Sequence, residues 1–321
     1  MSAAIEVAGL RKVFTVRRRR GLLRRSAEQV TAVDGVAFEI GPGEAVGYIG
    51  PNGAGKSTTI KMLTGILMPS AGRVRVAGLE PARRRTELAR RIGVVFGNRT
   101  QLWWDLPLRE SFELLRHIYR VPAAAHRERL GALSELLELA PFVETPVRQL
   151  SLGQRMRGEL TAALLHGPEV LFLDEPTVGL DIVSKARVRD FVARLNRDRG
   201  VTVLLTTHDL ADIERLCPRM IIVDHGRVLY DGGTAEIAGR FGALRTLVVD
   251  LAETAPPLRL PAGEVVRTDG PRQWIRFRPE ETTAAQLVAA VSQQARLVNL
   301  SIEEPDIEEV VRRIYLGERV S

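Results

Sequence analysis

One short glycine-rich segment constrains this 321-residue chain more than any other feature. It fits the pattern G-x-x-x-x-G-K-[ST], which is typical of loops that bind nucleotide phosphates. Glycines let the backbone bend so tightly that its N–H groups converge on phosphate oxygens. Lys56 is predicted to reach the β- and γ-phosphates, and the Ser57 hydroxyl to contact Mg²⁺. The residues predicted to bind the nucleotide here are Gly50, Pro51, Asn52, Gly53, Ala54, Gly55, Lys56, Ser57 and Thr58.

The flanking sequence supports this prediction. Residues 44–49 are typical of a buried strand, and residues 59–65 are typical of a short helix. A helix N-terminus offers free N–H donors and a partial positive charge, both of which favour phosphate binding. Since the motif is informative only between a strand and a helix, this context favours a phosphate site over a chance glycine turn.

Composition narrows the class of protein without naming a function. The length indicates about two domains, and a hydrophobic content of 45% is ample for a core. No stretch approaches the roughly 20 consecutive apolar residues of a membrane span. Because residues 1–6 also lack the layout of a signal peptide, we expect the chain to stay in the cytosol.

Cysteine usage and charge add two weaker constraints. Cys217 is the one cysteine, which excludes an internal disulfide and a cysteine metal cluster, and we expect a small buried side chain there. The formal net charge of +7 permits a nucleic-acid or anionic-membrane partner but does not demonstrate one.

Apolar runs that alternate with helical patterns predict a sheet whose parallel strands are buried on both faces. A helical block from about residue 100 to 165 interrupts these strands. Arg17 to Arg25 forms a dense basic stretch, predicted to be a loop. It is either a solvated hairpin insertion or a contact with anionic lipid or an acidic partner. The strand-like runs are 5–14, 31–40, 73–78, 90–96, 170–173, 201–207 and 221–223.

Two adjacent carboxylates, Asp174 and Glu175, end one of the buried apolar runs. Carboxylates in such a place are costly unless a cation or hydrogen bonds compensate them. Neighbours in a strand point to opposite faces, so the two side chains are predicted to have separate roles. Asp174 suits the surroundings of Mg²⁺ beside Ser57, and Glu175 suits a base or a positioner for the attacking water. The alternative is a solvated turn.

His208 ends another buried run, directly after two threonines. It is a candidate to donate a hydrogen bond to a γ-phosphate and to orient water, although a lone histidine at a strand end is more often structural. Further upstream, residues 150–155 read Leu-Ser-Leu-Gly-Gln-Arg. Ser151 is a good helix N-cap and Gly153 permits close approach of the backbone, which together predict a second anion site.

These motifs, in this order, closely resemble the ATP-binding subunits of ABC transporters over about residues 1–240. In that family two subunits pair head to tail, with ATP between one subunit's P-loop and its partner's signature helix. The resemblance implies that Ser151, Gly153 and Gln154 face the partner's nucleotide. It also implies a catalytic role for Glu175 and His208. Further roles implied are Asp174 as Walker B aspartate, Asp181 as D-loop aspartate and Phe14 as the aromatic that stacks on adenine.

The sequence departs from the family pattern at two points. The third signature residue is leucine where glycine is commonest, while the serine and glycine are kept. The glutamine expected after Phe96 is missing, so either Asn98 takes its role as a metal contact or Gln101 reaches back. Trp103 and Trp104 follow, in the region that meets the membrane subunit in this family. They suit an interface anchor or, equally, two core aromatics.

The predicted fold is α/β: a P-loop ATPase core with an inserted helical subdomain and an antiparallel β subdomain, plus a small α+β C-terminal domain. The ATP-binding domain is predicted to span residues 1–240 and the accessory domain residues 241–321, where two strands, a helix and a strand–turn–helix are expected. The accessory domain resembles the one that follows many ABC-2 type export ATPases. Dimer support or regulation is its role by analogy only.

The resemblance implies an ATP- and Mg²⁺-dependent ATP hydrolase that powers an ABC-2 type exporter at the cytoplasmic face of the membrane. Its expected partners are a separate integral membrane permease and a second ATPase subunit, a homodimer in the simplest case, and no nucleic acid. A soluble ABC ATPase that acts on ribosomes or nucleic acid is the alternative, favoured slightly by the charge. A P-loop kinase is disfavoured, because it needs no signature helix.

Overall fold

The computed structural model describes residues 3–20, 24–97, 99–237, 244–303 and 307–316. It divides into two compact units, residues 1–234 and 235–321. The domain boundary predicted after residue 240 falls in the stretch 238–243, outside the described residues.

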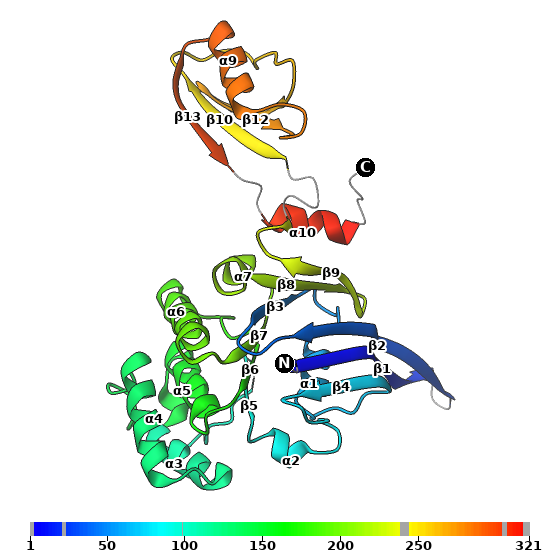
Figure 1. Ribbon diagram of the computed structural model, residues 1–321, viewed down its shortest axis with the longest axis vertical. Helices are drawn as coiled ribbons and strands as arrows, with labels where there is room; N and C mark the ends of the chain where they lie inside the picture. The colour runs from blue at the N-terminus through cyan, green and yellow to red at the C-terminus, as the bar shows by residue number, and fades with distance from the viewer. Residues whose placement is uncertain (1–2, 21–23, 98, 238–243, 304–306, 317–321) are drawn as a thin grey trace. The chain divides into compact units, whose positions relative to one another are not determined.

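A six-stranded sheet is the centre of the first unit, with strand order β5-β6-β7-β3-β8-β9 (Figure 1). Its strands are parallel except β9, which pairs antiparallel with β8 at one edge. β3, β6 and β7 are buried along their whole length, as expected for parallel strands covered on both faces. The bounds are β3 Ala45–Ile49, β5 Ile92–Phe96, β6 Val170–Asp174, β7 Thr202–Thr207, β8 Arg219–Asp224 and β9 Arg227–Gly233.

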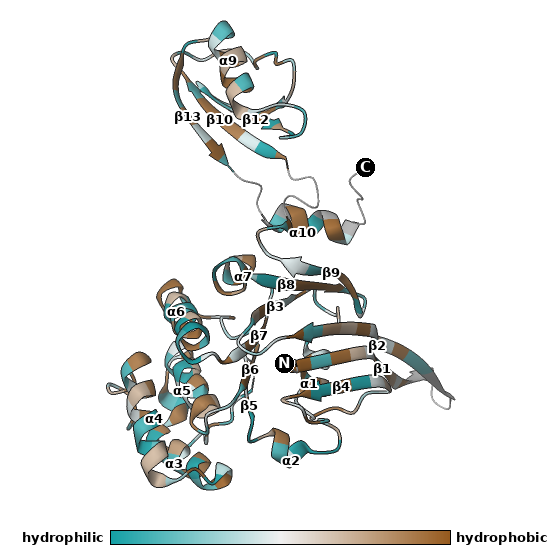
Figure 2. Cartoon of the chain, in the orientation of Figure 1, coloured by the Kyte–Doolittle hydropathy of each residue, from teal (hydrophilic) through white to brown (hydrophobic). Residues whose placement is uncertain are grey.

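A second, antiparallel sheet has the order β2-β1-β4, with bounds β1 Ile5–Arg20, β2 Arg24–Ile40 and β4 Ala71–Val76. Apolar and polar residues alternate along its strands (Figure 2), so one face is apolar. That face, with Ile5 and Phe38, packs in one hydrophobic core with Tyr48 and Phe172 of the central sheet. The two sheets therefore share a core that holds β3 and the loop after it in place.

The sequence predicted a loop for the basic stretch, with a hairpin insertion as one of two alternatives, and the structure has the hairpin, with strands that continue into the basic residues. Arg17–Arg20 continues β1 and pairs with residues 24–27 of β2, so that Arg17 lies opposite Ala27. The two strands extend together because a hairpin ladder satisfies backbone groups that a loop would leave to water.

Helices cover both sides of the central sheet. Figure 1 places α3 to α6 on one side, and α1 with the antiparallel sheet on the other. The helical block that the sequence predicted is present as α3, α4 and α5, which precede β6. The helices of the first unit are α1 Lys56–Leu63, α2 Arg85–Leu88, α3 Leu108–Tyr119, α4 Ala123–Leu136, the 3₁₀-helix Val147–Gln149, α5 Leu152–Leu164, α6 Ile182–Arg199 and α7 Leu210–Leu216.

The second unit is a four-stranded antiparallel sheet of order β11-β12-β10-β13 with a helix packed on it. Leu247, Ile275, Leu287 and Val291 are in its core. The sequence did not predict β11, because that strand is largely exposed and its polar residues mask the alternation. The bounds are β10 Arg245–Leu251, β11 Glu264–Asp269, β12 Arg272–Phe277, α9 Ala284–Gln294, β13 Leu297–Glu303 and α10 Ile307–Leu316.

Within the described ranges, none of the helices combines the length and the apolar character that crossing a bilayer requires.

His166, which follows α5, makes the stability of the first unit depend on pH. Its ring stacks on Tyr119 with centroids 4.2 Å apart, and its Nε2 lies 2.9 Å from the carbonyl oxygen of Ile92. Burial lowers the pKa of His166 from 6.5 to about 4, so the folded state keeps a neutral ring where the unfolded state binds a proton. The unfolding free energy contributed by this residue is therefore complete above pH 6.5 and falls as the pH drops towards 4.

We expect the His166→Phe variant to be less stable than the native chain at pH 7.5 but to lose less stability on acidification. Between pH 7.5 and pH 5 the native chain should lose about 2 kcal/mol more unfolding free energy than the variant, because its unfolded state binds a proton at His166. Urea unfolding of both chains at the two pH values measures it. Equal losses in the two chains would contradict the assignment.

Candidate functional site

The carboxyl ends of β3, β6 and β7 meet at one edge of the central sheet and form a cavity of about 610 Å³. Strand register brings them level, because Asp174 pairs with Thr206 and Ile49 pairs with Thr207. In open α/β sheets this edge is where ligands bind. The lining residues are Ala32, Gly50, Pro51, Asn52, Gly53, Gly55, Lys56, Ser57, Thr58, Gly97, Asp174, Glu175, Val178 and His208.

The loop after β3 needs its glycines for two different reasons. Gly53 and Gly55 have φ values of 89° and 97°, in the left-handed region that side chains disfavour. A Cβ at Gly55 would also lie 2.4 Å from the carbonyl oxygen of Ala32, whereas a Cβ at Gly53 meets nothing within 4 Å. Gly55 is therefore required by both conformation and space, and Gly53 by conformation alone.

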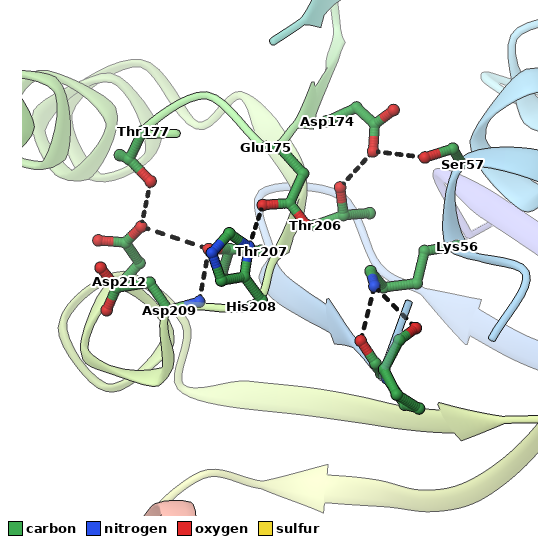
Figure 3. Close-up of polar contacts among 12 residues, drawn as sticks. Lys56, Ser57, Asp174, Glu175, Thr177, Thr206, Thr207, His208, Asp209 and Asp212 are labelled. Atoms are coloured by element: carbon green, nitrogen blue, oxygen red, sulfur yellow. Dashed lines mark hydrogen bonds and ion pairs between the residues drawn. The ribbon is translucent and has the colours of Figure 1, made fainter. Parts of the chain in front are cut away.

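Lys56 opens α1 and points back into the loop, with 7% of its surface exposed. Its Nζ donates to the carbonyl oxygens of Gly50 at 2.6 Å and Pro51 at 3.2 Å (Figure 3). Burial lowers the pKa of Lys56, while the carboxylates of Glu175 and Asp174 oppose that shift. The arrangement places a cation beside the loop, where a phosphate chain would be held.

Asp174, the last residue of β6, is buried, and hydroxyl groups compensate its carboxylate. Its Oδ1 accepts hydrogen bonds from Thr206 Oγ1 at 2.5 Å and from Ser57 Oγ at 3.2 Å (Figure 3). Mg²⁺ prefers hard oxygen ligands, typically one or two carboxylates with hydroxyls and phosphates. The hydroxyl of Ser57 and the carboxylate of Asp174 lie together and have this chemistry, so the residues fit a magnesium ion.

Glu175 is separated from Asp174 by backbone geometry, not by the strand alternation that the sequence analysis invoked. β6 ends at Asp174, and Glu175 has a φ of 57°, a left-handed conformation that turns the chain. The N–H of Glu175 donates to the carbonyl oxygen of Thr206 at 2.9 Å, which holds this turn. Glu175 Oε2 lies 2.8 Å from His208 Nδ1 (Figure 3). The structure therefore brings these two predicted catalytic side chains into contact.

The predicted signature residues lie elsewhere. Ser151 caps α5 in a reciprocal pair with Gln154: Ser151 Oγ accepts from the Gln154 N–H at 3.2 Å, and Gln154 Oε1 accepts from the Ser151 N–H at 2.9 Å. Gly153 packs so closely on α6 that a Cβ would lie 2.4 Å from Ser184 Oγ. Asp181 caps α6 by accepting from the Ser184 N–H at 2.9 Å. None of these residues lines the cavity, so within one chain the start of α5 is separate from it.

Three further predicted residues have different outcomes. Phe14 lies on β1 with Lys12 Nζ 5.3 Å from its ring centroid, and it does not line the cavity. Asn98 lies outside the described residues. Gln101 turns away from the cavity, because its amide donates to the carbonyl oxygens of Glu159 at 3.3 Å and Val94 at 3.5 Å.

The sequence analysis missed Thr206 as the partner of Asp174. Two hydroxyl residues at the end of a buried strand were a usable signal, because a buried hydroxyl needs a partner. Trp103 and Trp104 were left open as core or interface residues. They are 37% and 49% exposed, so the core alternative is wrong.

Comparisons with known proteins agree with this geometry. Residues 33–178 match the family model described as ABC transporter. The chain is 40% identical over 228 residues to Nod factor export ATP-binding protein I of Paraburkholderia xenovorans, covering 68% of this chain and 72% of the relative. It is 35% identical over 293 residues to the daunorubicin/doxorubicin resistance ATP-binding protein DrrA of Streptomyces peucetius, covering 86% of this chain and 84% of the relative.

Solved structures point the same way. An ATP-binding subunit of an ABC transporter superposes with a TM-score of 0.64 at 28% identity, covering 74% of this chain and 93% of that one. A dimeric ATP-binding cassette in a post-hydrolysis state with ADP and Pi superposes with a TM-score of 0.62 at 26% identity, covering 71% and 98%. The chain belongs to the ABC transporter family. It is an ATP-binding and ATP-hydrolysing subunit of that family.

The two loop glycines give a matched test of the nucleotide site. We expect Gly55→Ala to weaken ATP binding more than Gly53→Ala, by about tenfold or more, or about 1.4 kcal/mol. Both variants strain a left-handed backbone, but only the first drives a Cβ into a carbonyl oxygen. Titration of a fluorescent ATP analogue measures both affinities. Equal losses would show that space at Gly55 does not matter.

Proposed function

We propose that this chain powers an ABC-2 type exporter through ATP-driven closure of two copies. The observation that carries the proposal is the separation of the two anion sites. The cavity at the strand ends holds Lys56, Ser57 and Asp174, while Ser151 and Gly153 are presented at the start of α5. Two copies in head-to-tail arrangement would place each signature helix on the partner's nucleotide. Two relatives whose names describe export and drug resistance support the direction of transport.

The phosphates of ATP would bind the loop N–H groups and the N-terminus of α1. Lys56 would release the carbonyl oxygens of Gly50 and Pro51 and contact the β- and γ-phosphates. Ser57 and Asp174 would hold Mg²⁺. When bound, this ion neutralises charge that develops on the phosphoryl group. Asn98 as a further metal contact and Phe14 as the adenine platform stay predictions.

Hydrolysis would depend on Glu175 and His208. The left-handed turn at Glu175 directs its carboxylate into the cavity, where it would accept a proton from the attacking water. His208 holds that carboxylate through a 2.8 Å contact and would bridge to the γ-phosphate once the nucleotide is present. In phosphoryl transfer, catalysis is mostly positioning and electrostatic stabilisation, so the geometry of this pair matters more than its basicity.

Closure would drive a separate integral membrane permease, which would hold the chain at the cytoplasmic face of the membrane. Trp103 and Trp104 support a docking surface, because large aromatics are frequent anchors at interfaces and both are partly exposed. The guanidinium of Arg155 lies 5.8 Å from the Trp104 ring, and Arg148 pairs with Asp105 at 2.6 Å. Charged side chains therefore lie beside the aromatic pair, as they do at the rim of many interfaces.

A pull-down from native membranes in mild detergent tests the partner, with Trp104→Ala as the variant. We expect the native chain to retain a multi-span membrane protein in near-equal amount and the variant to retain several-fold less, because an aromatic anchor is lost. Trp274→Ala in the second unit is the matched control and should behave like the native chain. Recovery of ribosomal proteins or nucleic acid without a membrane subunit would leave the ATPase assignment intact and refute the transport role.

A further inference from the structure

A buried carboxylate that the proposed mechanism does not use lies behind the Glu175–His208 pair. Asp212 is on α7 and is fully buried. Its Oδ2 accepts hydrogen bonds from Thr177 Oγ1 at 2.5 Å and from Thr207 Oγ1 at 3.5 Å (Figure 3). A charge so deeply buried is retained only where its partners compensate it, so these contacts are costly to lose.

The two threonines are adjacent to the two catalytic side chains. Thr177 follows Glu175 by two residues, and Thr207 directly precedes His208. Both hydroxyls donate to the same oxygen of Asp212, so this carboxylate links the segment after β6 to the end of β7. The segments also meet through the N–H of Glu175 and the carbonyl oxygen of Thr206. Together these bonds link the segment that carries Glu175 to the segment that carries His208.

The second oxygen of Asp212 is held from α6. Arg189 Nε donates to Asp212 Oδ1, and Arg189 Nη2 lies 3.4 Å from Asp209 Oδ2. Lys185 Nζ donates to the same oxygen of Asp209 at 2.9 Å. Lys185 and Arg189 follow the α6 cap Asp181 at successive intervals of four residues, so they share one face of the helix. The carboxylate therefore has a cationic partner on one side and two hydroxyl donors on the other.

We propose that Asp212 is a positioning residue for ATP hydrolysis, which holds Thr177 and Thr207 and thereby fixes the Glu175–His208 pair. Asp212 does not line the cavity, so it acts through these neighbours and not on the nucleotide. The inference rests on the proposed roles of Glu175 and His208. An asparagine at this position has a single acceptor oxygen, so either Arg189 or the two hydroxyls lose the acceptor that they have in the native chain.

The Asp212→Asn variant of the full chain tests this role. We expect kcat for ATP hydrolysis to fall about tenfold or more while KM for ATP stays within about threefold, because Lys56, Ser57 and Asp174 are untouched. Glu214→Gln, an exposed carboxylate two residues further along α7, is the matched control and should keep the native kcat. A kcat within twofold of native in Asp212→Asn would overturn the proposal.

A double-mutant cycle separates positioning from general damage. In single-turnover assays over hours, Asp212→Asn should cost about tenfold in the native background and less than about twofold in the His208→Ala background, because the histidine it positions is gone. Equal losses in both backgrounds would overturn the proposal. If the double variant hydrolyses too slowly to measure, or Asp212→Asn does not fold, Thr177→Val decides. It removes only one hydroxyl and should lower kcat at least threefold with KM unchanged; an unchanged kcat overturns the proposal.

The Glu175→Gln chain, assayed in parallel, keeps this inference distinct from the proposed function. Near-native hydrolysis by that chain would refute the site assignment itself. Lost hydrolysis in Glu175→Gln, together with native kcat in Asp212→Asn and Thr177→Val, would refute the positioning role alone.

Discussion

The rest of the site depends on a carboxylate placed at the end of a fully buried parallel strand. β6 is apolar along its length and ends at Asp174, where the sheet edge opens into the cavity. Burying that charge would cost several kcal/mol if it were uncompensated. Hydroxyls from Thr206 on the neighbouring strand and from Ser57 on α1 compensate it. The same contacts therefore stabilise the fold and gather the groups that suit a metal and a phosphate.

After Asp174 the backbone leaves the strand in a conformation that strands do not adopt. Glu175 has positive φ, and the space beside its carbonyl oxygen is open only because residue 97 is glycine, where a Cβ would lie 2.5 Å away. A left-handed conformation at a non-glycine residue costs of order 1 kcal/mol or more and persists where its surroundings impose it. Here the hydrogen bond from the Glu175 N–H to the carbonyl oxygen of Thr206 imposes this conformation, together with the bond from Thr177 to Asp212. As a result, the carboxylate of Glu175 lines the cavity and contacts His208, while the adjacent carboxylate of Asp174 contacts Ser57.

Much of this was accessible from sequence, because the informative signals were local. The glycine pattern at residues 50–58, the apolar strands and the two adjacent carboxylates predicted a phosphate site that follows a buried strand, with Asp174 beside Ser57. Other features were missed or wrong for identifiable reasons. The strand at Arg17–Arg20 reads as a charged loop, since a run of arginines lacks the alternation of polar and apolar residues that indicates a strand. β11 lacks a buried face. The turn at Glu175 depends on non-local bonds. Asp212 reads as one more helix-surface acid, and only the fold reveals that it is buried among two threonines and Arg189.

The central claim is that one chain holds the nucleotide and a second chain completes the site. The most direct measurement is the mass of the Glu175→Gln chain by light scattering, with and without ATP and Mg²⁺. Loss of the proposed base should trap the bound nucleotide, so the account predicts a mass that doubles on adding ATP and returns on its removal. Further replacement of Ser151 by phenylalanine should prevent the doubling. A Glu175→Gln chain that binds ATP and stays monomeric would contradict the account.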